Sequence, residues 1–231
     1  MRRTLLRWGL VLVLLAPLAG VAQGQSVPTD LVLYVNDRAS PRALLNWEAR
    51  DIEDLCFTVD LDTTAEIAVL IVNTTLPQGI NSFAEEAFRV NGIGKAGQDN
   101  GVLILISTDE RAWRIEVGYG LQGVLPAGFV GRVGTDNITP YLAAGDFYSG
   151  IYEGTYEVAQ RIEDRYQPPP GEHPTPDLIV VDWRAVAIGI GIFILVSAIT
   201  KGRFLFWFGS IFKRGGFGGG RSGGGGARGG F

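Results

Sequence analysis

The segment from Ala185 to Thr200 most limits what this chain can fold into, because its 16 residues are apolar or small and none is charged. A helix that crosses a bilayer needs about 20 such residues. Trp183 at one edge, together with the long side chains of Arg184 and Lys201, extends the apolar length into the headgroup region. The sequence therefore predicts one transmembrane helix over residues 183–203.

The charges are divided unevenly around this segment. The 231 residues include 20 Lys and Arg and 24 Asp and Glu, a net charge of −4, but every acidic residue lies at or before Asp182. Residues 26–183 hold 24 acidic and 10 basic residues, which gives −14. An acidic folded part argues against nucleic-acid binding. The single cysteine, Cys56, argues against a disulfide scaffold or a Cys-rich zinc site.

The N-terminus has the pattern of a signal peptide, which we place at residues 1–24. Three arginines precede the apolar run Leu10–Leu18, and the small residues of Gly20-Val21-Ala22 suit a cleavage site. The alternative is an uncleaved anchor, but this run is much shorter than the ~20 residues that a span needs.

The region after the folded part has two biased compositions. Residues 167–182 form a Pro-rich linker that should be extended. Residues 204–231 are basic and Gly-rich, with 11 glycines among the last 17 residues, and we predict that this tail is disordered. Basic residues without acids after the apolar segment place the C-terminus in the cytoplasm by the positive-inside rule.

One domain remains, over residues 27–166, and its pattern predicts an α/β fold. Ile67–Val72, Gly101–Ser107 and Ala112–Val117 have the composition of buried strands. The last two are separated by four residues, too few for a parallel crossover, so they must form an antiparallel hairpin. A shorter strand is expected over 31–35, and helices from Ser40-Pro41 onward and over 81–90, 128–138 and 146–166. The result is a mostly parallel sheet with one antiparallel strand and helices on both faces.

Carboxylates and glycines are the candidate functional groups, because residues 27–166 contain no His. With the hairpin turn at Asp109-Glu110, the residue numbers of two directly opposite residues on the paired strands add up to 219. This pairing brings Asp99, Asn100 and Glu116 to one end of the sheet. Oxygen ligands beside a glycine-rich loop suit Ca²⁺ or Mg²⁺. The alternative stays open that Asp99 and Asn100 only shape a turn and that Glu116 is a satisfied buried acid.

Several motifs resemble the TPM domain. They are Tyr34-Val35-Asn36-Asp37, Gly92-Ile93-Gly94, Asp99-Asn100-Gly101-Val102-Leu103, Glu116 to Leu125, and Pro140 with Ala144-Gly145-Asp146-Phe147. The resemblance implies a three-layer α/β/α sandwich with a divalent cation site, commonly for Ca²⁺. It adds Asp37 and Asp146 to the ligand candidates Asp99, Asn100 and Glu116.

The resemblance also suggests a function. Plant relatives are linked to photosystem II repair and have been described as acid phosphatases, whereas bacterial relatives share this layout of signal peptide, domain, transmembrane helix and Gly-rich tail. We therefore expect a single-pass protein of the bacterial inner membrane, with its domain in the periplasm or extracytoplasmic space. Its expected role is a Ca²⁺-binding assembly or repair factor for membrane protein complexes.

The competing expectation is a metal-assisted acid phosphatase. Asp37 or Asp99 would then serve as nucleophile or general base beside the cation. Against this alternative, Lys95 and Arg114 are the only bases near the proposed site, and Arg114 is expected on the outer face of the sheet. A domain with a net charge of −14 also repels a phosphate substrate.

Overall fold

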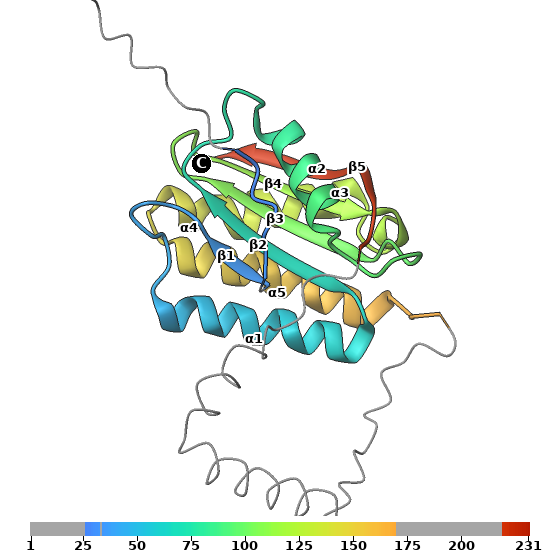
Figure 1. Ribbon diagram of the computed structural model, residues 1–231. Helices are drawn as coiled ribbons and strands as arrows, with labels where there is room; N and C mark the ends of the chain where they lie inside the picture. Colours follow the sequence, from blue (N-terminus) through green and yellow to red (C-terminus); the bar gives the residue numbers. More distant parts are fainter. Residues whose placement is uncertain (1–25, 33, 170–218) are drawn as a thin grey trace, which may run out of the picture.

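The computed structural model describes residues 26–32, 34–169 and 219–231 (Figure 1). The predicted signal peptide, residues 170–182 of the linker, the predicted transmembrane helix and residues 204–218 lie outside these ranges. Within them, no helix is both long enough and apolar enough to span a bilayer.

A five-stranded sheet forms the middle of the domain. The strands follow one another in space in the order β1-β2-β3-β4-β5, with β1, β2 and β3 parallel and β4 antiparallel to both of its neighbours. Only β4 therefore runs against the others, as the sequence predicts. The strands are β1 (Val35–Asp37), β2 (Glu66–Val72), β3 (Gly101–Ser107), β4 (Ala112–Gly118) and β5 (Ser222–Gly230).

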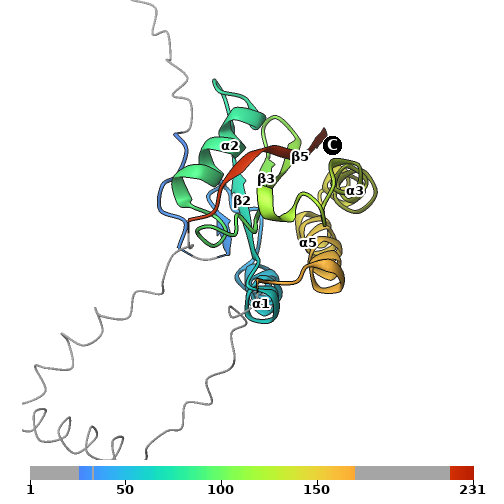
Figure 2. The same ribbon diagram turned by 90° about the vertical axis from the view of Figure 1, so that its right-hand side faces the viewer.

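Helices cover both faces of this sheet, which confirms the α/β/α arrangement. Figure 2 shows α2 on one side and α1, α3 and α5 on the other. The helices are α1 (Asn46–Thr63), α2 (Ile80–Asn91), α3 (Ala127–Arg132), α4 (Thr139–Ala143) and α5 (Phe147–Arg165), with a 3₁₀ turn η1 (Tyr119–Leu121) and a π-helical turn η2 (Val133–Ile138).

The apolar strands divide their side chains between two cores. Along β3, Leu103 and Leu105 pack beneath α2, whereas Ile104 and Ile106 face the larger helical layer. All seven residues of β2 and of β3 are buried. Because alternate residues of a strand point to opposite faces, a strand covered on both sides needs an unbroken apolar run.

The hairpin of β3 and β4 has the predicted register. Val102 pairs with Val117 and Leu103 with Glu116, so the residue numbers of each pair sum to 219. The backbone N–H of Gly120 donates to the carbonyl of Asp99, 3.0 Å away, which joins the loop before β3 to the end of β4.

The first helix begins later than the sequence predicts. Instead of starting at Ser40-Pro41, α1 begins at Asn46, with Leu45 as its N-cap. The carboxylate of Asp37 accepts hydrogen bonds from the backbone N–H groups of Ala43 and Leu44, which holds the intervening residues as a loop. A local side-chain bond to the backbone thus outcompetes the early helix start.

The tail also differs from the prediction. Residues 219–231 were expected to be disordered, yet Ser222–Gly230 form β5 along the edge of β4 (Figure 1). An open strand edge offers unpaired N–H and C=O groups to any extended segment that can approach. The composition predicted disorder because glycines have no side chain to bury in a core. It gives no information on pairing through the backbone, which is what holds this segment on β4.

Candidate functional site

The five predicted site residues lie at different places on the domain. In the parallel part of the sheet, Asp37 ends β1 and pairs with Ile71, whereas Asp99 and Asn100 precede Gly101, which pairs with Glu66 at the start of β2. Asp37 is therefore at the carboxyl-terminal end of the parallel strands, and Asp99 and Asn100 are at the amino-terminal end. Asp37 therefore does not lie beside Asp99 and Asn100 among the described residues, and its role as a metal ligand stays a prediction.

Asn100 is a structural centre of the amino-terminal end. Its side-chain oxygen accepts from the backbone N–H of Lys95, 2.8 Å away, and its amide donates to the carbonyl of Thr64 at 2.9 Å. The amide also lies 3.2 Å from the hydroxyl of Tyr166 at the end of α5. Asn100 is fully buried and joins three segments, which accounts for its position directly before a strand.

Glu116 and Arg114 form a buried ion pair at the same end. Arg114 Nε donates to Glu116 Oε2 at 3.0 Å, and the Glu116 side chain is 0% exposed. The two residues are two positions apart on β4, so their side chains share the α2 face of the sheet. Arg114 was expected on an outer surface, but β5 and the α2 layer bury it.

A second ion-pair network lies nearby and was missed by sequence reasoning. Lys95 Nζ lies 2.6 Å from Glu66 Oε1 and 2.9 Å from Asp60 Oδ1, and the hydroxyl of Tyr34 donates to Asp60 at 2.5 Å. Burial lowers the pKa of Lys95, but the bonds to Glu66 and Asp60 outweigh it and hold the pKa above its usual value. Glu66 is an acidic residue at the first position of an otherwise apolar strand, and this unusual placement is the sequence signal for the network.

Two carboxylates at the carboxyl-terminal end are satisfied differently. Asp37 accepts three backbone N–H groups, those of Ala39, Ala43 and Leu44 at 2.8–3.0 Å. Within the described ranges, no Lys or Arg forms a salt bridge with Asp37 or with Glu110.

Among the residues that the structure describes, Glu110 accepts hydrogen bonds only from neutral donors. Its Oε2 accepts the backbone N–H of Thr75 at 2.8 Å, and the hydroxyls of Thr74, Thr75 and Ser107 also donate to the carboxylate. Burial raises the pKa of Glu110, but these bonds outweigh it and leave the pKa below its usual value. Sequence reasoning treated Glu110 only as a turn residue.

The two remaining predicted ligands also have structural partners. Asp99 pairs with Arg221, Oδ1 to Nε at 3.4 Å, and its side chain is 13% exposed. Asp146 is the N-cap of α5 and accepts the backbone N–H of Ser149 at 3.0 Å. This bond lowers the pKa of Asp146. The cap satisfies one of the unpaired N–H groups at a helix start.

These positions do not fit a single cation site. Ca²⁺ takes six to eight oxygen ligands from groups that face one point. Here Asp37 and Asp146 each accept from nearby backbone N–H groups, Asp99 pairs with Arg221, and Glu116 pairs with Arg114. Among the described residues there is no group of three or more His, Cys, Asp or Glu placed to hold a metal ion. Whether the chain binds Ca²⁺ or Mg²⁺ stays a prediction.

The basic residues near the candidates are likewise engaged. Arg114 is paired with Glu116, and Lys95 with Glu66 and Asp60. A phosphate group would have to displace a carboxylate from either cation. The described geometry therefore offers the phosphatase alternative no specific support.

A row of aromatic rings on the helical layer is the other candidate site. Trp47 of α1 lies 5.1 Å from Tyr148, Tyr148 lies 5.7 Å from Tyr152, and Tyr152 is stacked on Tyr156 at 6.3 Å, all between ring centroids. The three tyrosines repeat every fourth residue along α5, which places them on one face of the helix. We call Trp47, Tyr148, Tyr152 and Tyr156 the aromatic row.

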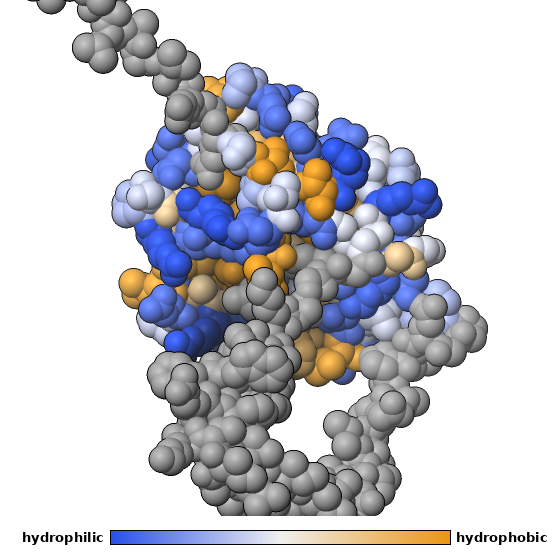
Figure 3. All heavy atoms as spheres, viewed as in Figure 1, coloured by the Kyte–Doolittle hydropathy of each residue, from blue (hydrophilic) through white to orange (hydrophobic). Residues whose placement is uncertain are grey.

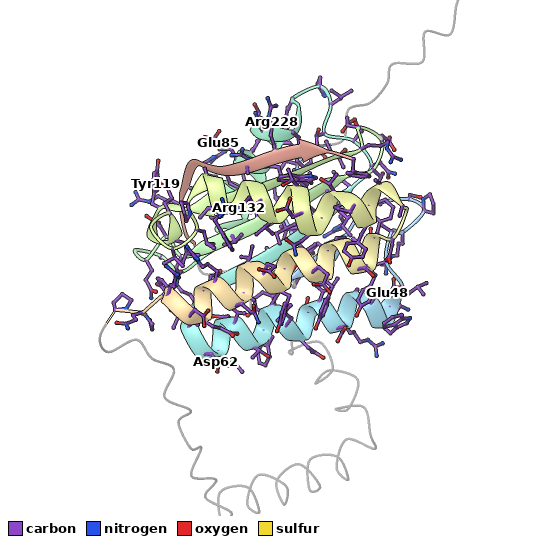
Figure 4. The ribbon with its side chains drawn as sticks, turned by 180° about the vertical axis from the view of Figure 1, so that it is seen from behind. Glu48, Asp62, Glu85, Tyr119, Arg132 and Arg228 are labelled. Atoms are coloured by element: carbon purple, nitrogen blue, oxygen red, sulfur yellow. The ribbon has the colours of Figure 1, made fainter. Side chains whose placement is uncertain are left out.

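The aromatic row is accessible and bordered by acids. Trp47 is 57% exposed and Tyr156 is 39% exposed. The hydroxyl of Tyr148 donates to Asp51 at 2.5 Å, and this bond, with burial and the negative charges of Asp51 and Glu48, raises the pKa of Tyr148 to about 12. Figure 4 shows α1 and α5 side by side on this face, with Glu48 near one end of α1. The sequence signal for the aromatic row is the four-residue spacing of Tyr148, Tyr152 and Tyr156. From the sequence alone, this spacing contributed only to the helix predicted over 146–166.

Solved structures include three similar domains. The N-terminal domain of a protein from P. gingivalis has 27% identity and a TM-score of 0.54, over 60% of this chain and 89% of that chain. The BA42 protein of Bizionia argentinensis has 20% identity and a TM-score of 0.49, over 55% and 86%. The N-terminal domain of cg2496 from Corynebacterium glutamicum has 14% identity and a TM-score of 0.45, over 58% and 82%.

A comparison with curated proteins gives no match. A comparison with family models matches the TPM domain over residues 35–161, which is more than half of the chain and includes β1 to β4 and most of α5. The structure's mixed sheet with helices on both faces agrees with the fold expected from that resemblance. This chain belongs to the TPM domain family.

Proposed function

We propose that this TPM domain is a noncatalytic binding module, tethered at the membrane, that helps to assemble or repair membrane protein complexes through the aromatic row. The observation that carries the proposal is the continuous contact of four aromatic rings across α1 and α5, with Trp47 and Tyr156 exposed. Trp and Tyr dominate the energetics of protein interfaces because they bury large areas at little entropic cost.

The charge of the domain suggests the chemistry of its partner. Residues 26–169 contain 21 acidic and 10 basic residues, a net charge of −11, and Glu48 and Asp51 border the aromatic row. A segment that presents Arg or Lys would meet both attractive carboxylates and the negative faces of the rings. We propose that the partner contacts this surface through such a basic segment.

The opposite face is less suited to such a contact. Figure 3 shows the side of α2, where hydrophobic residues are scattered among hydrophilic ones. Isolated apolar residues are normal on a soluble surface and do not mark an interface.

The proposal does not depend on a bound cation. Calcium was expected to shape the partner surface, but the residues proposed to hold it are separated and partnered, and the aromatic row contains none of them. Titrating the full chain with Ca²⁺ and with Mg²⁺ by calorimetry tests the expectation separately from partner binding.

Photo-cross-linking from the aromatic row tests the function. A photoreactive amino acid replaces Trp47 in the full chain in cells, and Tyr141 of α4, which is 40% exposed and outside the row, serves as the matched control position. We expect a membrane-protein adduct from position 47 that is absent from position 141 and is lost when Tyr156→Ala is added. Equal amounts of adduct from both positions, or no adduct from position 47, would contradict the proposal.

A further inference from the structure

The tail is held to β4 by an extended set of backbone pairs. Seven residue pairs join the two strands, from Ala112 with Gly230 to Gly118 with Ser222. Before the strand begins, the backbone N–H of Gly220 donates to the carbonyl of Gly92 at 3.1 Å. The contact thus extends from the loop after α2 along the whole of β4.

This edge accepts glycine where it would reject other residues. A Cβ at Gly229 would lie 2.6 Å from the ring of Trp113, which is fully buried and cannot move aside. A Cβ at Gly226, where φ is +157°, would overlap the carbonyl oxygen of Ile115. Close approach of two backbones is the condition under which a strand needs glycine.

Side chains fix the register at both ends of the tail. At one end Ser222 donates to Glu116, and Arg114 Nη2 donates to the carbonyl of Gly224 at 3.0 Å. At the other end the ring of Phe231 lies 5.1 Å from the guanidinium of Arg111 and 6.1 Å from the ring of Phe147. The buried ion pair of β4 therefore has partners that belong to the tail.

We propose that the edge of β4 is a recognition site for a glycine-rich strand, and that residues 219–231 of the same molecule occupy it on the domain's side of the membrane. The chain leaves the domain at Pro169 and is back on it at Gly219. A single membrane crossing between these residues would put the tail and β4 on opposite sides of the bilayer. The cytoplasmic C-terminus predicted from the positive-inside rule is incompatible with this pairing.

A disulfide tests whether the tail docks within one molecule. Paired residues of antiparallel strands have Cα atoms about 4.5–5.5 Å apart, which is within the range of about 4.4–6.8 Å that a disulfide spans. We expect Ala112→Cys with Gly230→Cys in the full chain to give mainly an oxidised monomer on a nonreducing gel. Native Cys56 is buried and stays in place. Ala112→Cys with Ser222→Cys is the control and should not cross-link, since Ser222 pairs with Gly118 at the far end of β4.

Glycine substitutions test the selectivity of the edge. Added to the cross-linking pair, Gly226→Ala should largely abolish the oxidised monomer, whereas Arg228→Ala should leave it unchanged. Arg228 lies on the same strand, is exposed and already carries a Cβ. Cross-linking that survives Gly226→Ala would refute a glycine-selective edge, and an oxidised dimer in place of the monomer would refute docking within one molecule.

Side-specific labelling tests the position of the tail. Sealed membrane vesicles that contain the full chain are treated with a membrane-impermeant maleimide, with Arg228→Cys or Glu85→Cys as the exposed thiol. We expect both positions to be labelled from the same side (both residues are marked in Figure 4). Labelling from opposite sides would overturn the inference, even if the proposed function of the aromatic row held.

Discussion

The two ends of the parallel strands stabilise their carboxylates in opposite ways. At the amino-terminal end, Glu66 and Glu116 are paired with Lys95 and Arg114. At the carboxyl-terminal end, Asp37 and Glu110 accept only uncharged N–H and O–H donors among the described residues. Ion pairing cancels the local charge, whereas neutral donors stabilise an anion and leave its charge in place. The carboxylates at the first end therefore depend on positively charged partners, whereas those at the second end depend on donors that carry no charge.

Removing one partner of the buried ion pair should have the largest effect. Arg114→Met leaves the carboxylate of Glu116 buried without its cation, which we expect to lower the free energy of unfolding by about 3–5 kcal/mol. Chemical denaturation of the full chain, followed by tryptophan fluorescence, measures this loss. The double variant Arg114→Met with Glu116→Leu should recover most of it. A loss below about 1 kcal/mol would mean that the pair behaves as an exposed one and would remove the contrast between the two ends.

Removing Asp37 should have the next largest effect. Asp37→Ala leaves three backbone N–H groups of the loop before α1 without their acceptor, and we expect a loss of about 2–3 kcal/mol. Asp37→Asn keeps one acceptor oxygen and is the matched control, with a smaller loss in the same denaturation experiment. Equal losses for the two variants would show that hydrogen bonding does not explain the role of Asp37.

Glu110 gives the carboxyl-terminal end a pH dependence. Its pKa is lower in the folded state than the ordinary value of 4.5, so its contribution to stability is present above about pH 4.5 and is lost as the pH falls through the folded pKa. We expect Glu110→Gln to lower stability by about 1 kcal/mol at pH 7, because solvent screens part of the interaction, and by less at pH 3. A difference from the parent chain that stays constant between these pH values contradicts the neutral-donor account.

The exposed pair of the tail should have the smallest effect. Arg221 is 78% exposed and its Nε is 3.4 Å from Asp99 Oδ1. Arg221→Ala should therefore change the free energy of unfolding by less than about 0.5 kcal/mol. Added salt should leave the difference from the parent chain nearly unchanged. A larger loss would show that ion pairing at the amino-terminal end extends to the surface.

The strands were predictable from the sequence because their signals are local. The runs that form β2 and β3 are unbroken and apolar, and the four-residue gap before β4 allows only a hairpin. The register followed from the turn position, and with it the proximity of Asp99 and Glu116.

The candidate site was less predictable because its partners are distant in sequence. The carboxylates were identified as unusual, but periodicity does not show whether a buried acid meets a cation, a backbone N–H or a metal. Asp37 was grouped with Asp99 and Glu116 through the resemblance alone, and only the register of β1 on β2 shows that it lies at the opposite end of the parallel strands. Lys95 and Asp60 are 35 positions apart, a separation at which no local pattern connects them.

The pairing of β5 with β4 also has a consequence for how the chain reaches its final structure. The hydrogen bond from Arg111 Nε to the carbonyl of Phe231 joins residues 120 positions apart, whereas β3 and β4 are joined by a short turn. Because contacts across long loops form more slowly than local ones, the four-stranded sheet should assemble first. During that interval β4 has an open edge, and crowded nascent copies risk joining through it. Rapid closure by the tail would then protect the protein against aggregation during its own folding.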